Sequence, residues 1–208
     1  MNKNLYFLGP KTSYTDFAKE QFITSFAIKG YEEKPMRTIT AVFSELNSNS
    51  KSLAVLPIEN SIEGTVKETI DNLIKIQSDK VKILGETVVS IEHCLITFAK
   101  DFSQIQKIKS HPQAISQCYD YIYSKFNDNI ILESESSTAN AVKSLTVEQP
   151  QIAAIGNKYS AEYYNMPILD TNINDEKFNQ TRFILLGIPL KEEVTNRDKT
   201  SIMFSTEN

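Results

Sequence analysis

The most informative stretch of the chain is an apolar run that passes into polar residues and then into an amphipathic helix. Residues 53–56 are all apolar and predict one buried strand, which should end near Pro57 because proline has no N–H for a sheet hydrogen bond. Polar residues 59–61 follow, and Thr65 and Glu68 have the spacing of a capping box at a helix start. Polar side chains in this position are typical of ligand sites in α/β sheets, although a loop that only caps the helix has the same pattern.

The rest of the chain repeats this alternation of apolar runs and amphipathic helices. Thr40 and Asn157 are expected N-caps of two helices. Pro112 suits the first turn of another helix, whose apolar period continues to Ile122. Further strands are expected at residues 5–8, 31–36 (an edge strand), 81–98 (one long strand, or two split near residues 92–93), 106–109, 130–132 (buried), 152–155 and 181–186. This order of elements predicts an α/β protein with parallel or mixed sheets covered by helices.

Composition narrows the classes of function. A chain of 208 residues with a formal charge of -4 has one domain or two small ones, and no basic cluster that would indicate nucleic acid or an anionic membrane. It has no apolar run near the length of a membrane span, and we expect a cytoplasmic protein. Cys94 and Cys118 form no CxxC motif, and His93 and His111 have no second ligand at i+3 or i+4. We therefore expect reduced cysteines and no metal site.

Candidate chemistry is concentrated in polar clusters beside strand ends and helix starts. These clusters are rich in hydroxyl and amide side chains and contain one arginine, and they lie at residues 13–15, 59–61, 110–113 with Gln117, 136–138 and 179–183. No glycine-rich phosphate loop is present, which excludes the usual nucleotide-binding motifs. A cleft lined by helix N-termini, hydroxyls and Arg182 suits a small anion that carries carboxylates.

Six segments of the sequence form a set of motifs that covers most of the chain as far as Gly187. They are LGPKTSYT (residues 8–15), VLPIENSIEGTV (55–66), KSHPQAISQC (109–118), SSTANAV (136–142), AAIGN (153–157) and NQTRFILLG (179–187). In this order they resemble the prephenate dehydratase family, whose enzymes make phenylpyruvate on the route to phenylalanine. The family usually has glycine where Thr12 stands. It also usually continues into a regulatory domain of ACT type, of which residues 199–204 resemble only the opening strand, in either a truncated or a naturally short form.

The resemblance implies a two-lobed α/β fold similar to the type II periplasmic binding proteins, with the active site in the cleft between the lobes. We assign residues 1–76 and 170–190 to one lobe of the catalytic domain and residues 77–169 to the other. Residues 191–208 would be a linker and the start of an incomplete ACT-like domain.

The resemblance also implies roles for individual residues. Thr181 matches the threonine associated with proton donation to the leaving hydroxyl. Catalytic positions that orient the substrate or the leaving group are matched by Glu59, Asn60 and Gln117. Candidates for binding the substrate are Ser13, Thr15, Ser61, Ser137, Thr138, Arg182 and Phe183. Arg182 has a structural ion pair as its alternative role, Phe183 could be pocket wall or core, and we expect His111 to cap its helix. No cofactor or metal is required, because formation of an aromatic ring drives the reaction.

Two other functions remain open on the sequence. A non-catalytic small-anion sensor could use the same fold, since fold does not imply function. An arogenate dehydratase would differ only in the side-chain group of its substrate. The family also suggests a homo-oligomer, dimer or higher, and the near-absence of a regulatory domain makes phenylalanine feedback through this chain unexpected.

Overall fold

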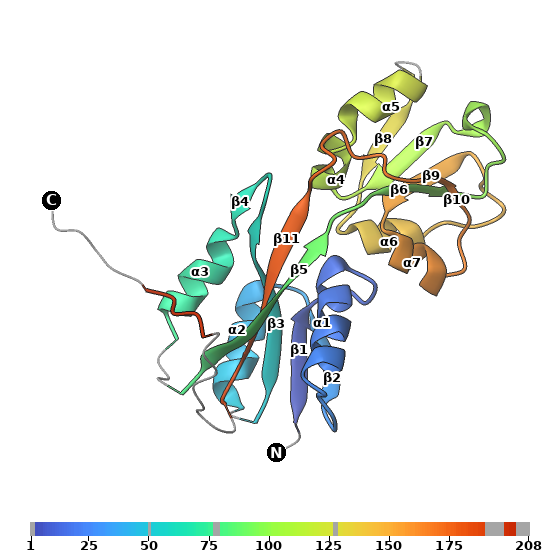
Figure 1. The fold of residues 1–208 in the computed structure, drawn as a ribbon. Coiled ribbons are helices and arrows are strands. Elements are labelled where there is room, and N and C mark those ends of the chain that lie inside the picture. Colours follow the sequence, from blue (N-terminus) through green and yellow to red (C-terminus); the bar gives the residue numbers. More distant parts are fainter. Residues whose placement is uncertain (1–2, 50, 77–79, 127–128, 190–197, 203–208) are drawn as a thin grey trace, which may run out of the picture.

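The computed structural model describes residues 3–49, 51–76, 80–126, 129–189 and 198–202. They form two lobes, each a mixed β-sheet with helices packed on both faces (Figure 1). Two connections, residues 91–93 and 171–179, join the lobes. The predicted two-lobed α/β fold is confirmed.

The first lobe is built on the longer strands. Across its sheet the strands are β2 (Glu32–Met36), β1 (Asn4–Leu8), β3 (Leu53–Asn60), β11 (Gln180–Gly187) and β5 (Lys82–Ser90), and β4 (Gly64–Thr65) pairs with β3. β1 is parallel to β2 and β3, whereas β11 is antiparallel to β3 and β5. The helices are α1 (Tyr14–Ser25), α2 (Ile39–Ser48) and α3 (Lys67–Ile74).

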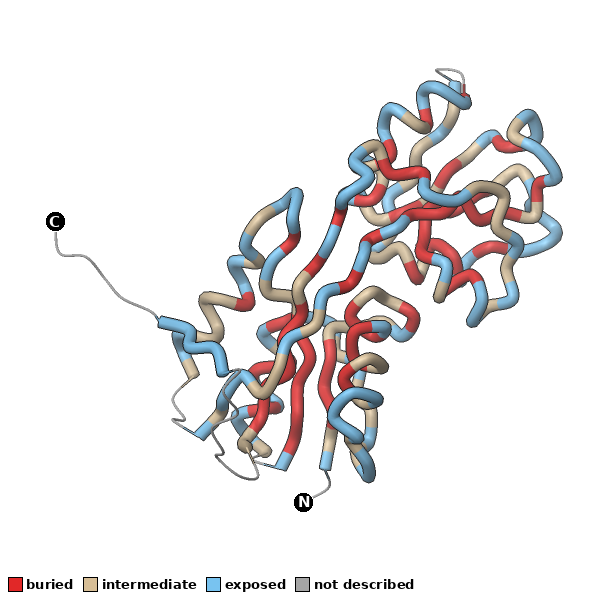
Figure 2. The backbone as a smooth tube through the Cα atoms, viewed as in Figure 1, coloured by how far each residue is buried: buried red, intermediate tan, exposed pale blue. Residues whose placement is uncertain are grey.

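Apolar residues on both faces of this sheet form its core. Phe7 and Val55 pack with Phe22 of α1 on one face. Leu56 packs with Phe43 of α2 on the other. Because helices cover both faces, the central strands are apolar at consecutive positions rather than alternating, and they are buried along most of their length (Figure 2).

The second lobe has shorter strands in the order β10 (Ile168–Asp170), β6 (Cys94–Thr97), β9 (Ile152–Gly156), β7 (Lys107–Ser110) and β8 (Ile131–Ser134). Its helices are α4 (Pro112–Ser116), α5 (Tyr119–Lys125), α6 (Thr138–Lys143) and α7 (Lys158–Tyr163), with one 3₁₀ turn at Phe102–Gln104. α4 and α5 cover one face of the sheet and α6 and α7 the other.

The division between the lobes differs from the predicted one. β5 pairs along its length with β11 in the sheet of the first lobe, so residues 82–90 belong there and not with residues 77–169. The expected boundary at residue 76 lies instead after Ser90, where the chain crosses to β6. The long segment predicted at residues 81–98 is two strands, split at residues 91–93, and each half joins a different sheet.

β3 continues past Pro57 to Asn60, three residues beyond the predicted end. The register between β3 and β11 shifts at this point, since Arg182 pairs with Glu59 but Phe183 pairs with Pro57. Bulges are among the few places in a sheet where proline, which has no N–H to donate, is found. As a result, β3 carries Asn60 to a position directly opposite Thr181.

Two predicted helix caps are wrong. α2 is capped by Thr38, whose Oγ1 accepts from the Ala41 N–H at 3.1 Å, and not by Thr40. α3 has no side-chain cap, so the capping box of Thr65 and Glu68 does not form. The Glu68 carboxylate accepts instead from the backbone N–H and the hydroxyl of Thr40, which ties α3 to α2.

Three further expectations differ from the structure. The helix predicted from Pro112 to Ile122 is broken into α4 and α5, with Gln117 at the break. The strand predicted as buried at residues 130–132 is the edge strand β8, and Ile131 is exposed. Residues 198–202 have no regular secondary structure, and the remainder of the ACT-like strand lies outside the described residues.

Candidate active site

A cavity of about 480 Å³ lies between the two lobes. The first lobe contributes the start of α1, the end of β3 and the start of β11, while the second lobe contributes the starts of α4 and α6. These elements meet because β1 and β3 end at the same edge of their sheet, where α/β proteins bind ligands. Most of the residues predicted for the site line this cavity, namely Ser13, Thr15, Asn60, Gln117, Ser137, Thr138 and Thr181.

Asn60 uses its carboxamide to order this part of the wall. Its Oδ1 accepts from the backbone N–H groups of Ile62 and Glu63, both at 3.0 Å. Its Nδ2 donates to Asn179 Oδ1 at 2.7 Å and to Thr181 Oγ1 at 2.9 Å, and also contacts the Gln180 carbonyl at 3.1 Å. Because both ends of the carboxamide are occupied, Asn60 holds Thr181 rather than presenting a free group to the cavity.

The hydrogen bond from Asn60 orients the hydroxyl of Thr181. Its side chain accepts a hydrogen bond from Asn60, and within the part of the chain that the structure describes its own O–H donates to no other group. Thr181 is only 8 % exposed and lines the cavity. Its hydrogen is therefore available to an acceptor in the cavity.

The hydroxyls at the helix starts divide into caps and free groups. Ser13 caps α1 through the Asp16 N–H at 3.2 Å, and Ser137 caps α6 through the Asn140 N–H at 3.0 Å. The hydroxyl of Thr15 makes no hydrogen bond among the described residues, although the residue is buried beside the cavity. His111 caps α4, as expected, since its Nδ1 accepts from Gln113 N–H at 3.3 Å.

Four predicted site residues do not line the cavity. Arg182 follows the cavity residue Thr181 on β11, and Glu59 precedes the cavity residue Asn60 on β3. Because successive side chains of a strand point to opposite faces, Arg182 and Glu59 point away from the cavity. There Arg182 Nη2 lies 2.8 Å from Glu59 Oε2 and Nη1 lies 3.5 Å from Glu86 Oε2. Arg182 thus has the structural ion pair rather than the anchoring role. Hydrogen bonding to Lys199, together with Arg182, lowers the pKa of Glu86.

The other two have structural positions as well. Phe183 is in the core of the first lobe, packed with Phe7 and Val55, and is not a pocket wall. Ser61 donates to the Phe178 carbonyl at 3.0 Å and accepts from the Gln180 N–H at 2.9 Å. Ser61 therefore fastens the end of β3 to the connection that leads into β11.

Arg37 is a cavity residue that the sequence analysis missed. It lies between β2 and α2, lines the cavity, and has no ion pair among the described residues. No polar cluster or motif surrounds it in the sequence, so only the fold reveals it. Its free guanidinium makes it the arginine that can bind a carboxylate in this cavity.

His93 and Asn179 are also additional site residues, and both contact Gln117. His93 Nε2 and Asn179 Nδ2 each lie 3.1 Å from Gln117 Oε1. His93 is 2 % exposed, and burial lowers its pKa, which keeps the imidazole neutral. Spacing alone could not have found this contact, because the three residues come from three separate segments.

One group of acidic side chains in the described residues has ligand spacing for a metal ion, Asp16, Glu20 and Glu33. The ammonium group of Lys19 lies at its centre, with ion pairs to all three carboxylates. This cluster is therefore an ion-pair network of the first lobe, in which Lys19 and Asp16 are buried and the two glutamates are partly exposed.

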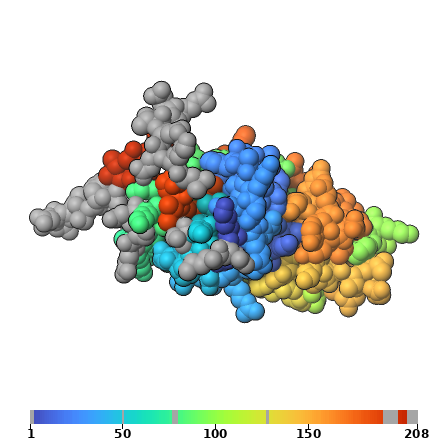
Figure 3. Space-filling model, turned by 90° about the horizontal axis from the view of Figure 1, so that it is seen from below, coloured from blue at the N-terminus to red at the C-terminus, as the bar shows by residue number. Residues whose placement is uncertain are grey.

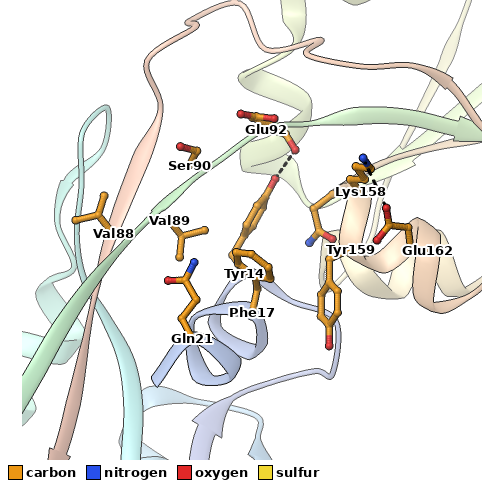
Figure 4. A pocket seen from close by; sticks show the side chains of 11 residues that line it. Tyr14, Phe17, Gln21, Val88, Val89, Ser90, Glu92, Lys158, Tyr159 and Glu162 are labelled. Carbon is orange, nitrogen blue, oxygen red and sulfur yellow. Dashed lines mark hydrogen bonds and ion pairs between the residues drawn. The ribbon is translucent and has the colours of Figure 1, made fainter. Parts of the chain in front are cut away.

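A second cavity of about 500 Å³ lies between α1, β5 and α7 (Figure 4). Tyr14 lines both cavities, and Phe17 and Tyr159 make a ring contact across the lobes at 5.8 Å between centroids. Viewed from below, the blue surface of α1 adjoins the orange surface around α7 (Figure 3). Of the hydroxyl and carboxamide side chains in the motifs, this cavity contains only those of Tyr14 and Asn157 among the described residues.

A two-lobed α/β fold with hydroxyls, carboxamides and a free arginine in the cleft is typical of proteins that bind small anionic molecules. The sequence profile of the family described as prephenate dehydratase matches residues 5–190. The chain therefore belongs to the prephenate dehydratase family, and the resemblance carried by its motifs is confirmed.

Individual relatives agree with this assignment. A prephenate dehydratase of Methanocaldococcus jannaschii is 40 % identical over 98 % of this chain and 72 % of its own length. The crystal structure of a prephenate dehydratase from Staphylococcus aureus has a TM-score of 0.74 at 29 % identity, covering 90 % of this chain and 67 % of that one. One from Arthrobacter aurescens, in complex with L-Phe, has a TM-score of 0.76 at 27 % identity, covering 92 % and 62 %. The chain spans only about half the length of the bifunctional chorismate mutase/prephenate dehydratases it also matches.

Proposed function

We propose that this cavity catalyses the decarboxylating dehydration of prephenate to phenylpyruvate, a carbon–oxygen lyase step in phenylalanine biosynthesis. Prephenate carries a ring carboxylate, a pyruvyl carboxylate and a ring hydroxyl. The bond to the ring carboxylate breaks to release CO₂, its electron pair enters the ring, and the hydroxyl leaves as water after taking up one proton. Because the ring becomes aromatic, the protein has to bind two carboxylates and supply one proton.

The observation that carries the proposal is the hydrogen bond from Asn60 Nδ2 to Thr181 Oγ1 at 2.9 Å. It occupies a lone pair of the threonine and leaves its hydrogen for the departing hydroxyl. A threonine is a weak acid in water, but a preorganised donor in a partly closed cavity stabilises charge that develops in the transition state. The proton that Thr181 gives up is restored from water.

The carboxylates are bound by groups from both lobes in this proposal. Arg37 supplies the positive charge, and the hydroxyls of Thr15 and Thr138 line the same cavity. The start of α1, with Ser13 as its cap, adds backbone N–H groups that favour an anion. Gln117 contributes an uncharged donor from the second lobe.

Thr181→Ala tests the assignment of the donor. The variant should lose about a hundredfold in kcat, the equivalent of ~3 kcal/mol for one preorganised donor, with its circular dichroism spectrum unchanged. Thr181→Ser keeps the hydroxyl and is the matched control, which should retain most of the turnover. The measurement is the rate of phenylpyruvate formation from prephenate, and near-normal turnover by the alanine variant would remove Thr181 from this role.

The same assay separates the remaining alternatives. A non-catalytic sensor would bind prephenate without forming product, and an arogenate dehydratase would have the higher kcat/KM for arogenate when both substrates are compared.

A cytoplasmic location and a homo-oligomeric state also remain part of the proposal. The location agrees with an enzyme of amino-acid biosynthesis and with two free, buried cysteines. Within the residues that the structure describes, no helix is both long and apolar enough to cross a bilayer.

A further inference from the structure

A directional chain of hydrogen bonds runs along the wall of the inter-lobe cavity. It begins at the backbone N–H groups of Ile62 and Glu63, which donate to Asn60 Oδ1 at 3.0 Å. Asn60 Nδ2 donates to Asn179 Oδ1 at 2.7 Å, and Asn179 Nδ2 donates to Gln117 Oε1 at 3.1 Å. This series of hydrogen bonds thus links the first lobe, one inter-lobe connection and the second lobe.

The orientation of every carboxamide in this chain follows from its first step. Backbone N–H groups can only donate, so the Asn60 atom that both of them contact must be the oxygen. The amide nitrogen of Asn60 then faces Asn179, so the Asn179 atom that accepts this hydrogen bond must be its oxygen. The nitrogen of Asn179 in turn faces Gln117, so the Gln117 atom at this contact is Oε1.

His93 donates to the same oxygen from the other side. Gln117 Oε1 carries no hydrogen, so His93 Nε2, 3.1 Å away, must be the protonated ring nitrogen. The other nitrogen, Nδ1, lies 3.4 Å from the hydroxyl of Tyr14. The single hydrogen of that hydroxyl is donated to the Glu92 carbonyl at 2.7 Å (Figure 4). The backbone of His93 is held as well, since its N–H donates to Asn174 Oδ1 at 2.6 Å.

Two donors on Oε1 leave the NH₂ group of Gln117 without a partner among the described residues, and Gln117 lines the cavity. We propose that His93 and Asn179 are positioning residues that hold the Gln117 carboxamide with its NH₂ group directed at the substrate. A flipped carboxamide would direct an oxygen at an anionic substrate and place NH₂ against two donors. The proposal deepens the function proposed above and rests on it, because the reaction is what Gln117 serves.

Substitutions of His93 test the proposal, because they either keep or remove the hydrogen-bond donor that faces Gln117 Oε1. His93→Leu removes the donor at similar volume and should lower kcat roughly ten- to a hundredfold, the range for one preorganised donor or less. His93→Gln places an amide nitrogen near the position of Nε2 and should recover most of the lost turnover. Equal losses in both variants, or none in either, would overturn the proposal.

A double-mutant cycle shows whether His93 acts through Gln117. In a Gln117→Ala background, His93→Leu should cause no further loss of kcat, whereas a merely structural role predicts that the two losses multiply. Multiplicative losses would overturn the proposal.

Asn179→Asp is an independent isosteric test that applies even where His93→Leu fails to fold. It keeps the oxygen that faces Asn60 and replaces the donor that faces Gln117 by a second oxygen. We expect a loss of kcat in the same range with an unchanged circular dichroism spectrum, and normal turnover would overturn the proposal. If the parent protein itself does not convert prephenate, the proposed function fails, whereas an active parent with insensitive variants refutes the positioning role alone.

Discussion

Arg37 and Arg182 show how neighbours decide what a charged residue does. Arg182 pairs with Glu59 and Glu86 on the outer face of β11, with 41 % of its side chain exposed, so its charge is compensated and partly screened by water. Arg37 has no acidic partner among the described residues and lines the cavity. The sequence motif therefore suggested Arg182 as the arginine of the cavity, whereas in the fold Arg37 lines it.

These two arginines provide a matched pair for substrate binding. Arg37→Leu should raise KM for prephenate by about tenfold or more, because it removes a charge-assisted hydrogen bond to a carboxylate, worth roughly 1.5–3 kcal/mol. Arg182→Leu, measured in the same assay, should leave KM within about twofold, since the pair it breaks is an exposed one. A large KM effect for Arg182 alone would reverse the assignment.

At the scale of an element, α1 lines the cavity with its first residues and carries an unusually buried charge. Lys19 is 1 % exposed on this helix and lies over the Phe7 ring, 4.7 Å from its centroid. Burial alone would lower the pKa of Lys19, but hydrogen bonds to Asp16, Glu20 and Glu33 outweigh it and raise the pKa above the usual value. Asp16 also accepts from the Thr12 N–H at 2.7 Å, so this network supports the loop before the α1 start.

Lys19→Met should therefore destabilise the protein strongly. The substitution leaves the buried Asp16 carboxylate without its cation, and breaking a buried pair in this way costs about 3–5 kcal/mol. The partly exposed Glu20 and Glu33 lose the same partner at a smaller cost. Lys34→Met is the control, because Lys34 pairs with Glu32 on the surface and an exposed pair contributes about 0–1 kcal/mol. Chemical denaturation at pH 7 measures both, and equal effects would contradict the account of the buried network.

The helices and strands were easier to predict from the sequence than the distant residues to which they are hydrogen-bonded. Caps formed by residues next to their own helix, such as Ser13, Asn157 and His111, follow from local spacing. α5 is different, because the Asp175 carboxylate accepts from its first N–H groups, at Asp120 and Tyr121, from far along the chain. Such long-range partners also explain why Glu68 bonds to Thr40 instead of forming a capping box. Local spacing contains no information about them.

At the scale of the whole molecule, the relation between the lobes depends on contacts other than the two connections. Asn157 caps α7 in the second lobe through the Ser160 N–H at 2.6 Å. Its Nδ2 also donates to the Thr12 carbonyl of the first lobe at 3.0 Å, in a buried position. Thr12 has a φ of 69° in the left-handed region, where the family usually has glycine, so this bond supports a strained turn beside the cavity.

Asn157→Asp isolates the inter-lobe bond. Aspartate still caps α7, but it places an oxygen against the Thr12 carbonyl, and we expect the free energy of unfolding to fall by ~2 kcal/mol, the cost of a buried unsatisfied group. Asn157→Ser keeps a helix cap but is too short to reach the Thr12 carbonyl, so the free energy of unfolding should fall by less. Urea denaturation distinguishes the two, and an aspartate variant as stable as the parent would show that the bond contributes nothing.

The sequence by itself determined the alternation of strands and helices, the helix starts capped by His111 and Asn157, and the family, because all of these depend on residues close together along the chain. Tertiary structure alone decided that β5 belongs to the first lobe, that Arg37 rather than Arg182 lines the cavity, and that His93 and Asn179 converge on Gln117. The physical reason is that sheet pairing and the face of a strand place distant side chains together. A shift of one residue along a strand, which is invisible to composition or spacing, moves a side chain from the cavity to the solvent.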